Sequence, residues 1–219
     1  MATVEGLMQK RLVVWMVLVF CTLVSQNAFA KTDLGLKAIG GDVGFVDPDN
    51  IDGTLGFGMF ANMGTFSPEI QFAPHIGYWS KSETFDGDKA SISDISLAAR
   101  GQYMFPVSSP KFRPYAGAGL GLHMVHAKIE IAEQDMGGGF IIPAYEASDT
   151  STKLGLDLGG GFVTPLSEKT DFCLDLWYTA VSDVGHLSLK AGVSFDLPGG
   201  GSTRSEPPAR PVKKRTIRR

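Results

Sequence analysis

The feature that most limits the fold of this chain is an alternation of apolar and polar residues with a period of two, running from residue 34 to residue 197. Such alternation predicts β-strands with two different faces, and no part of this stretch shows a sustained helical period. Each predicted strand is long enough to cross a bilayer at a tilt, which takes about 9–11 residues. We expect eight strands, at 34–46, 53–63, 69–80, 91–105, 113–127, 153–164, 170–181 and 186–197.

The two faces of strands two to eight differ sharply in composition. One face comprises 37 positions without a charge, and the other 37 positions hold eight charges and ten glycines. The interior of an eight-stranded barrel is only just wide enough for side chains, so the large apolar residues do not fit inside it. Lipid, in contrast, requires an uninterrupted apolar exterior. The sequence therefore predicts an all-β, eight-stranded antiparallel up-and-down transmembrane β-barrel with a small, polar interior.

The connections between the predicted strands indicate an orientation. At one end of the barrel we expect short turns at 64–68, 106–112 and 165–169. At the other end we expect longer acidic loops at 81–90 and 128–152, together with brief connections at 47–52 and 182–185. Outer-membrane barrels have short periplasmic turns and longer outer loops, and an even strand count then places both chain termini in the periplasm. This orientation places aromatic residues in two girdles, namely Tyr103, Phe105, Phe162, Phe172 and Phe195 at the periplasmic ends, and Tyr78 and Tyr178 at the outer ends.

Strand one has an ambiguous register. Leu34, Leu36 and Ala38 share one face, whereas Val43 and Phe45 have the opposite parity. We expect a β-bulge at the pair of glycines at 40–41 to reset the register.

The N-terminus has the parts of a secretory signal peptide. Lys10 and Arg11 precede a run of 13 apolar residues at 12–24, and Ala28-Phe29-Ala30 follows as a small-residue cleavage site. The run is shorter than the roughly 20 residues of a membrane helix, which disfavours the alternative of an uncleaved anchor. We predict residues 1–30 as a signal peptide cleaved after Ala30, and residues 31–197 as the barrel, with Cys173 as its single cysteine.

Charge separates the barrel from the C-terminal segment. Residues 31–197 hold 11 Lys and Arg against 21 Asp and Glu, whereas residues 198–219 hold seven against one. The segment 198–219 has almost nothing to bury, and we expect a disordered basic periplasmic tail. Its basic cluster at 213–219 can bind anionic lipid headgroups or an anionic envelope polymer, or it can be a solvated tail without a partner; an exported protein should not meet nucleic acid.

The last predicted strand, KAGVSFDL at 190–197, resembles the β-signal of outer-membrane barrels at Lys190, Gly192, Phe195 and Leu197. In that family the barrel assembly machinery reads this segment, although here the chain continues past it. The span 31–197 resembles the small OmpA/OmpX-type outer-membrane β-barrel domain family, as do the stretches PHIGYWSKSE and SISDISLAARGQYMF. The resemblance implies a monomeric barrel in contact with outer-membrane lipid and lipopolysaccharide. It implies no single activity, because the family includes adhesins and structural barrels.

Charges of both signs fall on the predicted inner face. Arg100, Asp157, Asp175 and Lys190 lie near the middle of their strands, with Asp94 and Lys153 nearer the ends. Because an unpaired buried charge is costly, we expect the four central residues to form one paired network that plugs the lumen, with Asp175 and Lys190 as direct neighbours. The alternative is a gated polar path for small solutes.

Two further motifs suggest chemistry only weakly. His186 and Ser188 resemble the His-x-Ser pair of outer-membrane lipid A deacylases, but the pair faces inward in the predicted register, away from lipid. The acidic turn at 47–53 resembles a calcium loop without the spacing of an EF-hand, so an ordinary Asp/Asn-rich turn is the simpler explanation. His75, His123 and His126 lack companions at metal-ligand spacing. We therefore predict no catalytic, cofactor or metal site.

These observations favour a structural or surface-interaction function, such as adhesion or envelope integrity, for a barrel that displays acidic loops outward. A narrow channel for small solutes is the second hypothesis, and a lipid A-modifying enzyme is the third.

Overall fold

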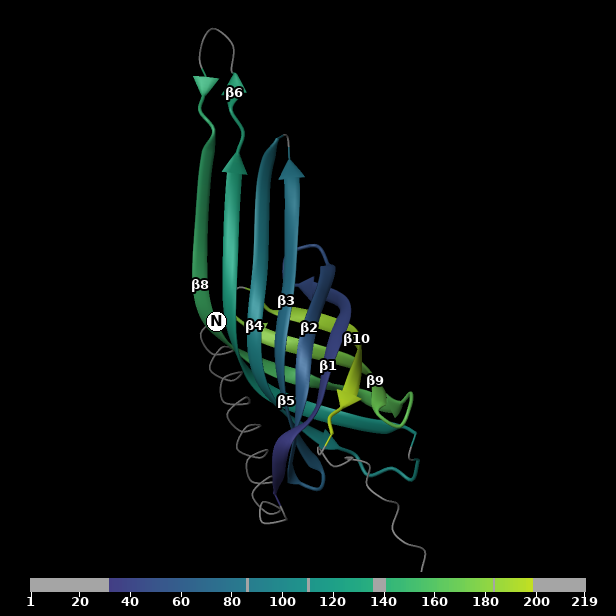
Figure 1. Ribbon diagram of the computed structural model, residues 1–219. Helices are drawn as coiled ribbons and strands as arrows, with labels where there is room; N and C mark the ends of the chain where they lie inside the picture. Colours follow the sequence, from purple (N-terminus) through teal and green to yellow (C-terminus); the bar gives the residue numbers. More distant parts are fainter. Residues whose placement is uncertain (1–31, 86, 110, 136–140, 183, 199–219) are drawn as a thin grey trace, which may run out of the picture.

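The computed structural model describes residues 32–85, 87–109, 111–135, 141–182 and 184–198 of the chain. Its elements are all strands, and Figure 1 shows them in sequence colours. Eight long strands carry the fold, and they match the eight predicted from the alternation. They are β1 (Asp33–Pro48), β2 (Thr54–Ser67), β3 (Ile70–Phe85), β4 (Asp88–Met104), β5 (Arg113–Ile131), β8 (Tyr145–Pro165), β9 (Thr170–Val181) and β10 (His186–Asp196).

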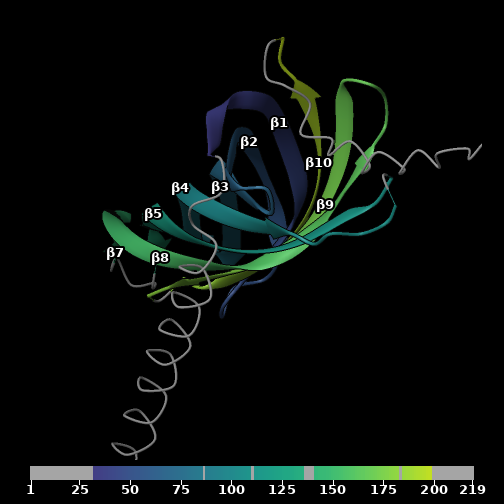
Figure 2. The ribbon, with the colours of Figure 1, turned by 90° about the horizontal axis from the view of Figure 1, so that it is seen from below.

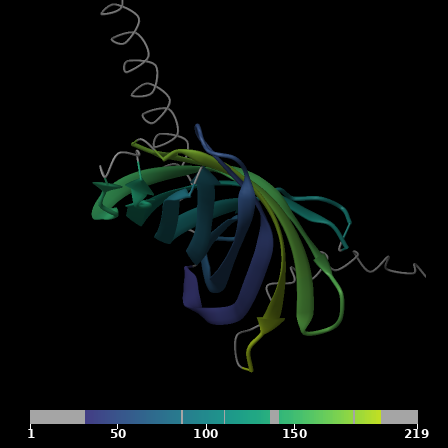
Figure 3. The ribbon, with the colours of Figure 1, turned by 90° about the horizontal axis from the view of Figure 1, so that it is seen from above.

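These eight strands form one closed antiparallel barrel. Each strand pairs with its neighbours in the chain, and β1 closes the ring against β10, from Ala38 opposite Asp196 to Pro48 opposite His186. The views from below and above show the strands arranged around one axis (Figures 2 and 3). This architecture confirms the predicted eight-stranded up-and-down barrel. We call the end where β1 begins and β10 ends the terminal end, and the opposite end the distal end.

The outer surface of the barrel is apolar, as the face analysis predicted. Leu55, Met59, Leu120 and Leu154 are each at least 65% exposed, and they alternate with buried or half-buried inward residues. A soluble protein does not expose so wide an apolar band, because it would associate or precipitate. Among the described residues, no helix is long and apolar enough to cross a membrane.

The segments 81–90 and 128–152, which we predicted as long loops, are mostly strand. β3 and β4 stay paired up to Phe85 opposite Asp88, and β5 and β8 up to Ile131 opposite Tyr145. Beyond them, β6 (Gln134–Asp135) pairs with β7 (Ile141–Ile142) and continues the second hairpin. The loop prediction was wrong because both faces of these segments meet water, so the apolar alternation fades although the backbone pairing continues.

These extensions form a four-stranded sheet that rises above the distal end of the barrel (Figure 1). We call it the raised sheet and define it as residues 80–85, 88–93, 126–131 and 145–152. β2 pairs with β3 only as far as Trp79, and β9 pairs with β8 only as far as Gly155. Within the described residues, no strand pairs with the outer edge of β8 at 145–152, and we call this stretch the free edge.

Strand one keeps a regular register across the pair of glycines where we predicted a bulge. Gly40 and Gly41 pair continuously with β10 and with β2, and the register shift lies earlier, between Leu34 and Ala38. Ala38 is therefore buried inside, and Val43 and Phe45 point outward with the rest of the apolar face. The short predicted turn at 64–68 is also partly strand, because β2 runs to Ser67 across two further register shifts against β3.

The predicted signal peptide at 1–30 and almost all of the predicted tail at 198–219 lie outside the described residues.

Candidate functional site: the polar lumen and the raised sheet

Small residues on the inner face of the barrel make room for charged ones. A Cβ atom at Gly119 would lie 2.8 Å from Cγ of Arg100, and one at Gly58 would lie 2.7 Å from Nε2 of His75. Real Cβ atoms almost never approach other atoms so closely, so both positions require glycine or a displaced neighbour. The glycine-rich face is thus the structural condition for a charged lumen in a narrow barrel.

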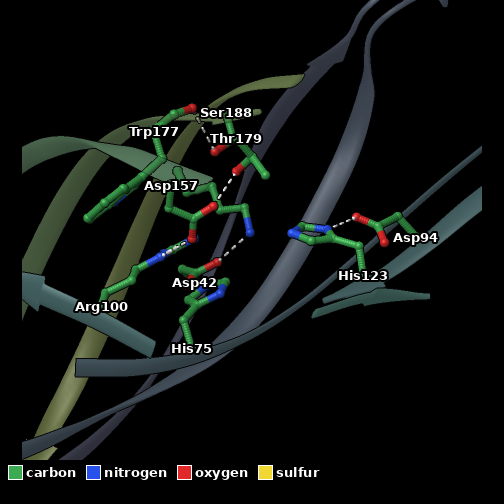
Figure 4. A network of polar contacts seen from close by, with 10 residues as sticks. Asp42, His75, Asp94, Arg100, His123, Asp157, Trp177, Thr179 and Ser188 are labelled. Carbon is green, nitrogen blue, oxygen red and sulfur yellow. Dashed lines mark hydrogen bonds and ion pairs between the residues drawn. The ribbon is translucent and has the colours of Figure 1, made fainter. Parts of the chain in front are cut away.

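Arg100 lies at the centre of the first polar cluster (Figure 4). Its Nε donates to Oδ2 of Asp157 at 2.8 Å, and its guanidinium carbon lies 4.3 Å from the ring centroid of Trp177. The other carboxylate oxygen of Asp157 accepts a hydrogen bond from the Thr179 hydroxyl at 2.8 Å. Asp157 is only 1% exposed, so its charge depends on these partners. The structure thus brings together two of the four residues of the predicted network.

Lys190 belongs to a second cluster, formed with strands on its other side. Its ammonium lies 3.2 Å from Oδ1 of Asp42, and Oδ2 of Asp42 lies 2.9 Å from Nε2 of His75 (Figure 4). Asp42 is on β1, whose register we could not assign from the sequence. The closing pair of β1 and β10 brings it next to Lys190.

Asp175 lies directly opposite Lys190 in the β9–β10 ladder, but the predicted Asp175–Lys190 ion pair is absent from the described residues. Asp175 instead accepts a hydrogen bond from the hydroxyl of Tyr115 on β5, which lies on the other side of β8 from β9. The expectation was wrong because Lys190 reaches Asp42 on β1, a carboxylate that the sequence register had not placed inside. Two separate clusters and a Tyr–Asp pair replace the single predicted network.

Apolar side chains pack together in the distal part of the lumen. Val46, Trp79, Val125 and Val184 form one buried cluster, with Ile92 packed against it. We call this the distal apolar cluster.

Two histidines lie beside the distal apolar cluster. The imidazole of His186 packs against Trp79 at 5.9 Å and against His123 at 6.2 Å between ring centroids. Nδ1 of His123 lies 2.8 Å from Oδ2 of Asp94. His123 and His75 are interior residues, while His126 is exposed and contacts Thr150.

The two weak motifs are also placed by the structure. His186 and Ser188 are buried and face the lumen, and the Ser188 hydroxyl donates to the backbone carbonyl of Trp177 at 3.4 Å. The acidic turn at 47–53 connects β1 and β2 at the distal end. In the described part of the chain, no three of His, Cys, Asp and Glu gather in a way that could hold a metal ion.

The residues that match the β-signal lie on or just after β10. Lys190 and Gly192 face inward, Phe195 is 55% exposed on the outer face, and Leu197 follows the strand with its backbone N–H donating to the carbonyl of Lys37. The residues of this motif therefore lie on both the inner and the outer face of the strand that closes the barrel.

The raised sheet carries its own charge cluster. The ammonium of Lys128 lies 2.8 Å from a carboxylate oxygen of Glu130 and 2.8 Å from one of Glu146. The hydrogen bonds that the Lys128 ammonium donates to these two carboxylates raise the pKa of Lys128 to about 12, and the same ammonium lowers the pKa of Glu130. The opposite face of the sheet continues the inner face of the barrel and carries exposed Phe85, Ile129 and Tyr145.

A closed barrel with an apolar exterior and a paired polar interior is the arrangement expected of a membrane-spanning β-protein. In agreement with this, the profile of a family described as the outer membrane protein beta-barrel domain matches residues 16–196. The chain belongs to this family. The family places the barrel in an outer membrane and confirms the fold predicted from the alternation.

Solved structures of the same architecture are distant in sequence. Neisserial surface protein A has 18% identity and a TM-score of 0.56, covering 74% of this chain and 97% of the other. A major outer membrane protein from Thermus thermophilus has 10% identity and a TM-score of 0.54, covering 74% and 99%. At these identities the likeness concerns the fold alone. No curated protein matches the chain.

Proposed function

We propose that this outer-membrane barrel acts at the cell surface as a structural and surface-interaction protein with a closed lumen, serving adhesion or envelope integrity. The observation that carries the proposal is the raised sheet, which lifts ordered backbone beyond the barrel at the distal end. In the predicted orientation, with the chain termini in the periplasm, this sheet projects outward from the cell.

The free edge of β8 supports an interaction role in particular. In the described part of the chain, residues 145–152 pair with β5 on one side only, so the backbone groups of the other edge are available to an added strand. Natural sheets usually shorten or cover such edges, because they recruit other chains. Next to this edge, Tyr145 and Ile129 offer exposed apolar surface for the alternate side chains of the added strand. We infer that an extended segment of an extracellular protein binds there by strand addition.

A hairpin-trimmed variant tests this role. In it a two-residue Asn-Gly turn replaces residues 126–150 and joins Val125 to Ser151, which face each other in the β5–β8 ladder, so most of the free edge is removed and the barrel is kept. Random ten-residue peptides displayed on phage serve as probes, selected against the intact barrel in lipid nanodiscs. Selected peptides should bind the intact barrel, protect the amides of 145–152 from hydrogen exchange, and lose binding to the trimmed variant. Equal binding to both barrels, or no enrichment, would reject the raised sheet as the interaction site.

The closed lumen is proposed from the side chains that fill it. The distal apolar cluster lies above the polar clusters, and together they support a closed lumen over the alternative of a solute channel. Planar-bilayer recording of the intact protein should give no stable open level. A steady conductance would favour the channel instead.

We further infer that the barrel is not a lipid A-modifying enzyme. The support is that His186 and Ser188 face the lumen, whereas a lipid-cleaving pair must reach the membrane. Release of acyl chains from lipid A vesicles by the purified barrel, lost in a Ser188→Ala variant, would contradict this.

Five further expectations from the sequence remain predictions. The signal peptide is cleaved after Ala30, and the barrel assembly machinery recognises the last strand at Lys190, Gly192, Phe195 and Leu197. The barrel is a monomer in contact with lipopolysaccharide, and its basic tail binds an anionic envelope polymer.

A further inference from the structure

The terminal half of the lumen is not filled. A cavity of about 60 Å³ extends from the level of His75 and Arg100 toward the strand ends, where Asp196 lines it. We call this cavity the vestibule. Because a water molecule needs about 10–15 Å³ of such volume, the vestibule holds about four waters or one small polar head group. Its walls are mostly hydrogen-bonding groups, among them Asn62, Gln71, Gln102, Tyr115, Asp175 and Asp196.

The charges of the vestibule do not balance. Three carboxylates line it, from Asp171, Asp175 and Asp196. Arg113 forms an ion pair with Asp171. Arg100, which also lines the vestibule, forms its ion pair with Asp157, which does not line it. Among the residues that the structure describes, the two remaining carboxylates form no ion pair.

The contacts of these two carboxylates differ in detail. Asp175 accepts a hydrogen bond from the neutral hydroxyl of Tyr115, which itself is only 5% exposed. Among the described residues, no side-chain hydrogen bond or ion pair is found for Asp196. A half-buried carboxylate in a low-dielectric wall attracts a cation more strongly than one in bulk water does. Two of them in one cavity form a site whose charge is complementary to a cation.

We propose that the vestibule binds an organic cation, namely an ammonium or guanidinium group that enters from the terminal end. Such a group donates several hydrogen bonds, and the vestibule offers the oxygens of Asp175 and Asp196 and the amide oxygen of Gln71 as acceptors. Charge-assisted hydrogen bonds of this kind are about twice as strong as neutral ones. This site is separate from the raised sheet, at the opposite end of the barrel.

Two sources can supply the same chemistry. The chain's own basic segment begins two residues after Asp196 and holds seven Lys and Arg, the first of them Arg204. At about 3.3 Å per residue, the eight residues from Asp196 to Arg204 span up to about 26 Å, which is enough to return a side chain into the vestibule. A free amine of the periplasm is the other source.

The experiment measures binding of agmatine, which carries both an ammonium and a guanidinium group, to the refolded barrel in lipid nanodiscs by titration calorimetry. Four proteins are compared: the intact chain, a chain ending at Pro198, and that truncated chain with Asp175→Asn or Asp196→Asn. Tetramethylammonium at equal ionic strength is the control ligand, because it has the charge without N–H donors. Each variant is run on a gel unheated and heated, and slower migration of the heated sample verifies that the unheated barrel is folded.

Agmatine should bind the truncated chain, and each Asn variant should weaken binding at least about tenfold, since a hydrogen bond to a charged group contributes about 1.5–3 kcal/mol. Tetramethylammonium should not compete. If the basic segment is the source, the intact chain binds agmatine at least about tenfold more weakly than the truncated chain; if a free amine is the source, the two chains bind equally. Absence of binding to the truncated chain, unchanged binding in both Asn variants, or equal competition by tetramethylammonium would overturn the proposal.

Discussion

At the scale of single residues, the lumen depends on which carboxylate each cation reaches. Asp42 and Asp157 are almost fully buried, and each is bound by one cation and one further polar group. Their stabilisation therefore comes from these specific partners and not from water. Removing the cation leaves an uncompensated buried charge, which is far more costly than the loss of an exposed ion pair.

The partner of Lys190 is a testable point. Lys190→Met should lower the free energy of unfolding by about 3–5 kcal/mol, because it leaves Asp42 without its cation. The double variant with Asp42→Asn should cost clearly less than the sum of the two single variants. Denaturant unfolding in lipid vesicles measures the coupling.

The matched control is the double variant of Lys190→Met with Asp175→Asn. Its coupling should be clearly smaller than that of the Lys190–Asp42 pair, because Asp175 lies opposite Lys190 without an ion pair and only a longer-range charge attraction joins the two. A strong coupling of Lys190 to Asp175 and none to Asp42 would restore the pairing that the sequence alone suggested.

The charge cluster of the raised sheet predicts a pH dependence. Glu130 has a lowered pKa, so its contribution to the order of the sheet is complete above its ordinary value of 4.5 and is lost as the pH falls through the lowered pKa. Lys128 has a raised pKa, so its contribution is complete below 10.5 and is lost as the pH rises through about 12.

Hydrogen exchange of the Ile129 and Ala147 amides, corrected for the intrinsic pH effect, checks this. Protection should be constant between about pH 5 and about pH 10, within the window set by those two values, and should fall outside it. In a Lys128→Met variant the low-pH loss should disappear. A fall in protection near pH 7 would contradict the assignment to Lys128 and Glu130.

At the scale of strands, the alternation of inward and outward positions predicted most of the fold. Eight strands with one uncharged face allow only one burial pattern in a narrow barrel, so Arg100, Asp157, Asp175 and Lys190 could be placed inside from the sequence. Their partners could not, because strand one had an uncertain register and Asp42 depends on it. The raised sheet was missed because water on both faces removes the alternation on which the strand prediction rests.

A prediction at this scale compares two outward positions on neighbouring strands. Leu176 is mid-strand on β9 and half exposed on the apolar band, so Leu176→Arg should cost about 2–4 kcal/mol of unfolding free energy. Thr152 has the same outward parity on β8 but lies in the raised sheet, beyond the barrel. Thr152→Arg should change stability by less than about 0.5 kcal/mol.

Unfolding of both variants in lipid vesicles distinguishes a membrane-facing band from an ordinary protein surface. Equal tolerance at the two positions would show that the apolar band does not face lipid.

At the scale of the whole molecule, the protein divides along the barrel axis. The terminal end holds the vestibule, the middle holds the paired charges, the distal apolar cluster lies above them, and the raised sheet projects beyond it. This division has a function only if the distal end faces outward. The orientation is therefore the central claim.

Cysteine labelling on whole cells tests the orientation most directly. Asp149→Cys lies in the raised sheet and Ser108→Cys in the β4–β5 turn at the terminal end, while the native Cys173 is buried. A membrane-impermeant maleimide should label the cysteine at 149 on intact cells, and the cysteine at 108 only after the outer membrane is permeabilised. Labelling at 108 but not at 149 on intact cells would contradict the account.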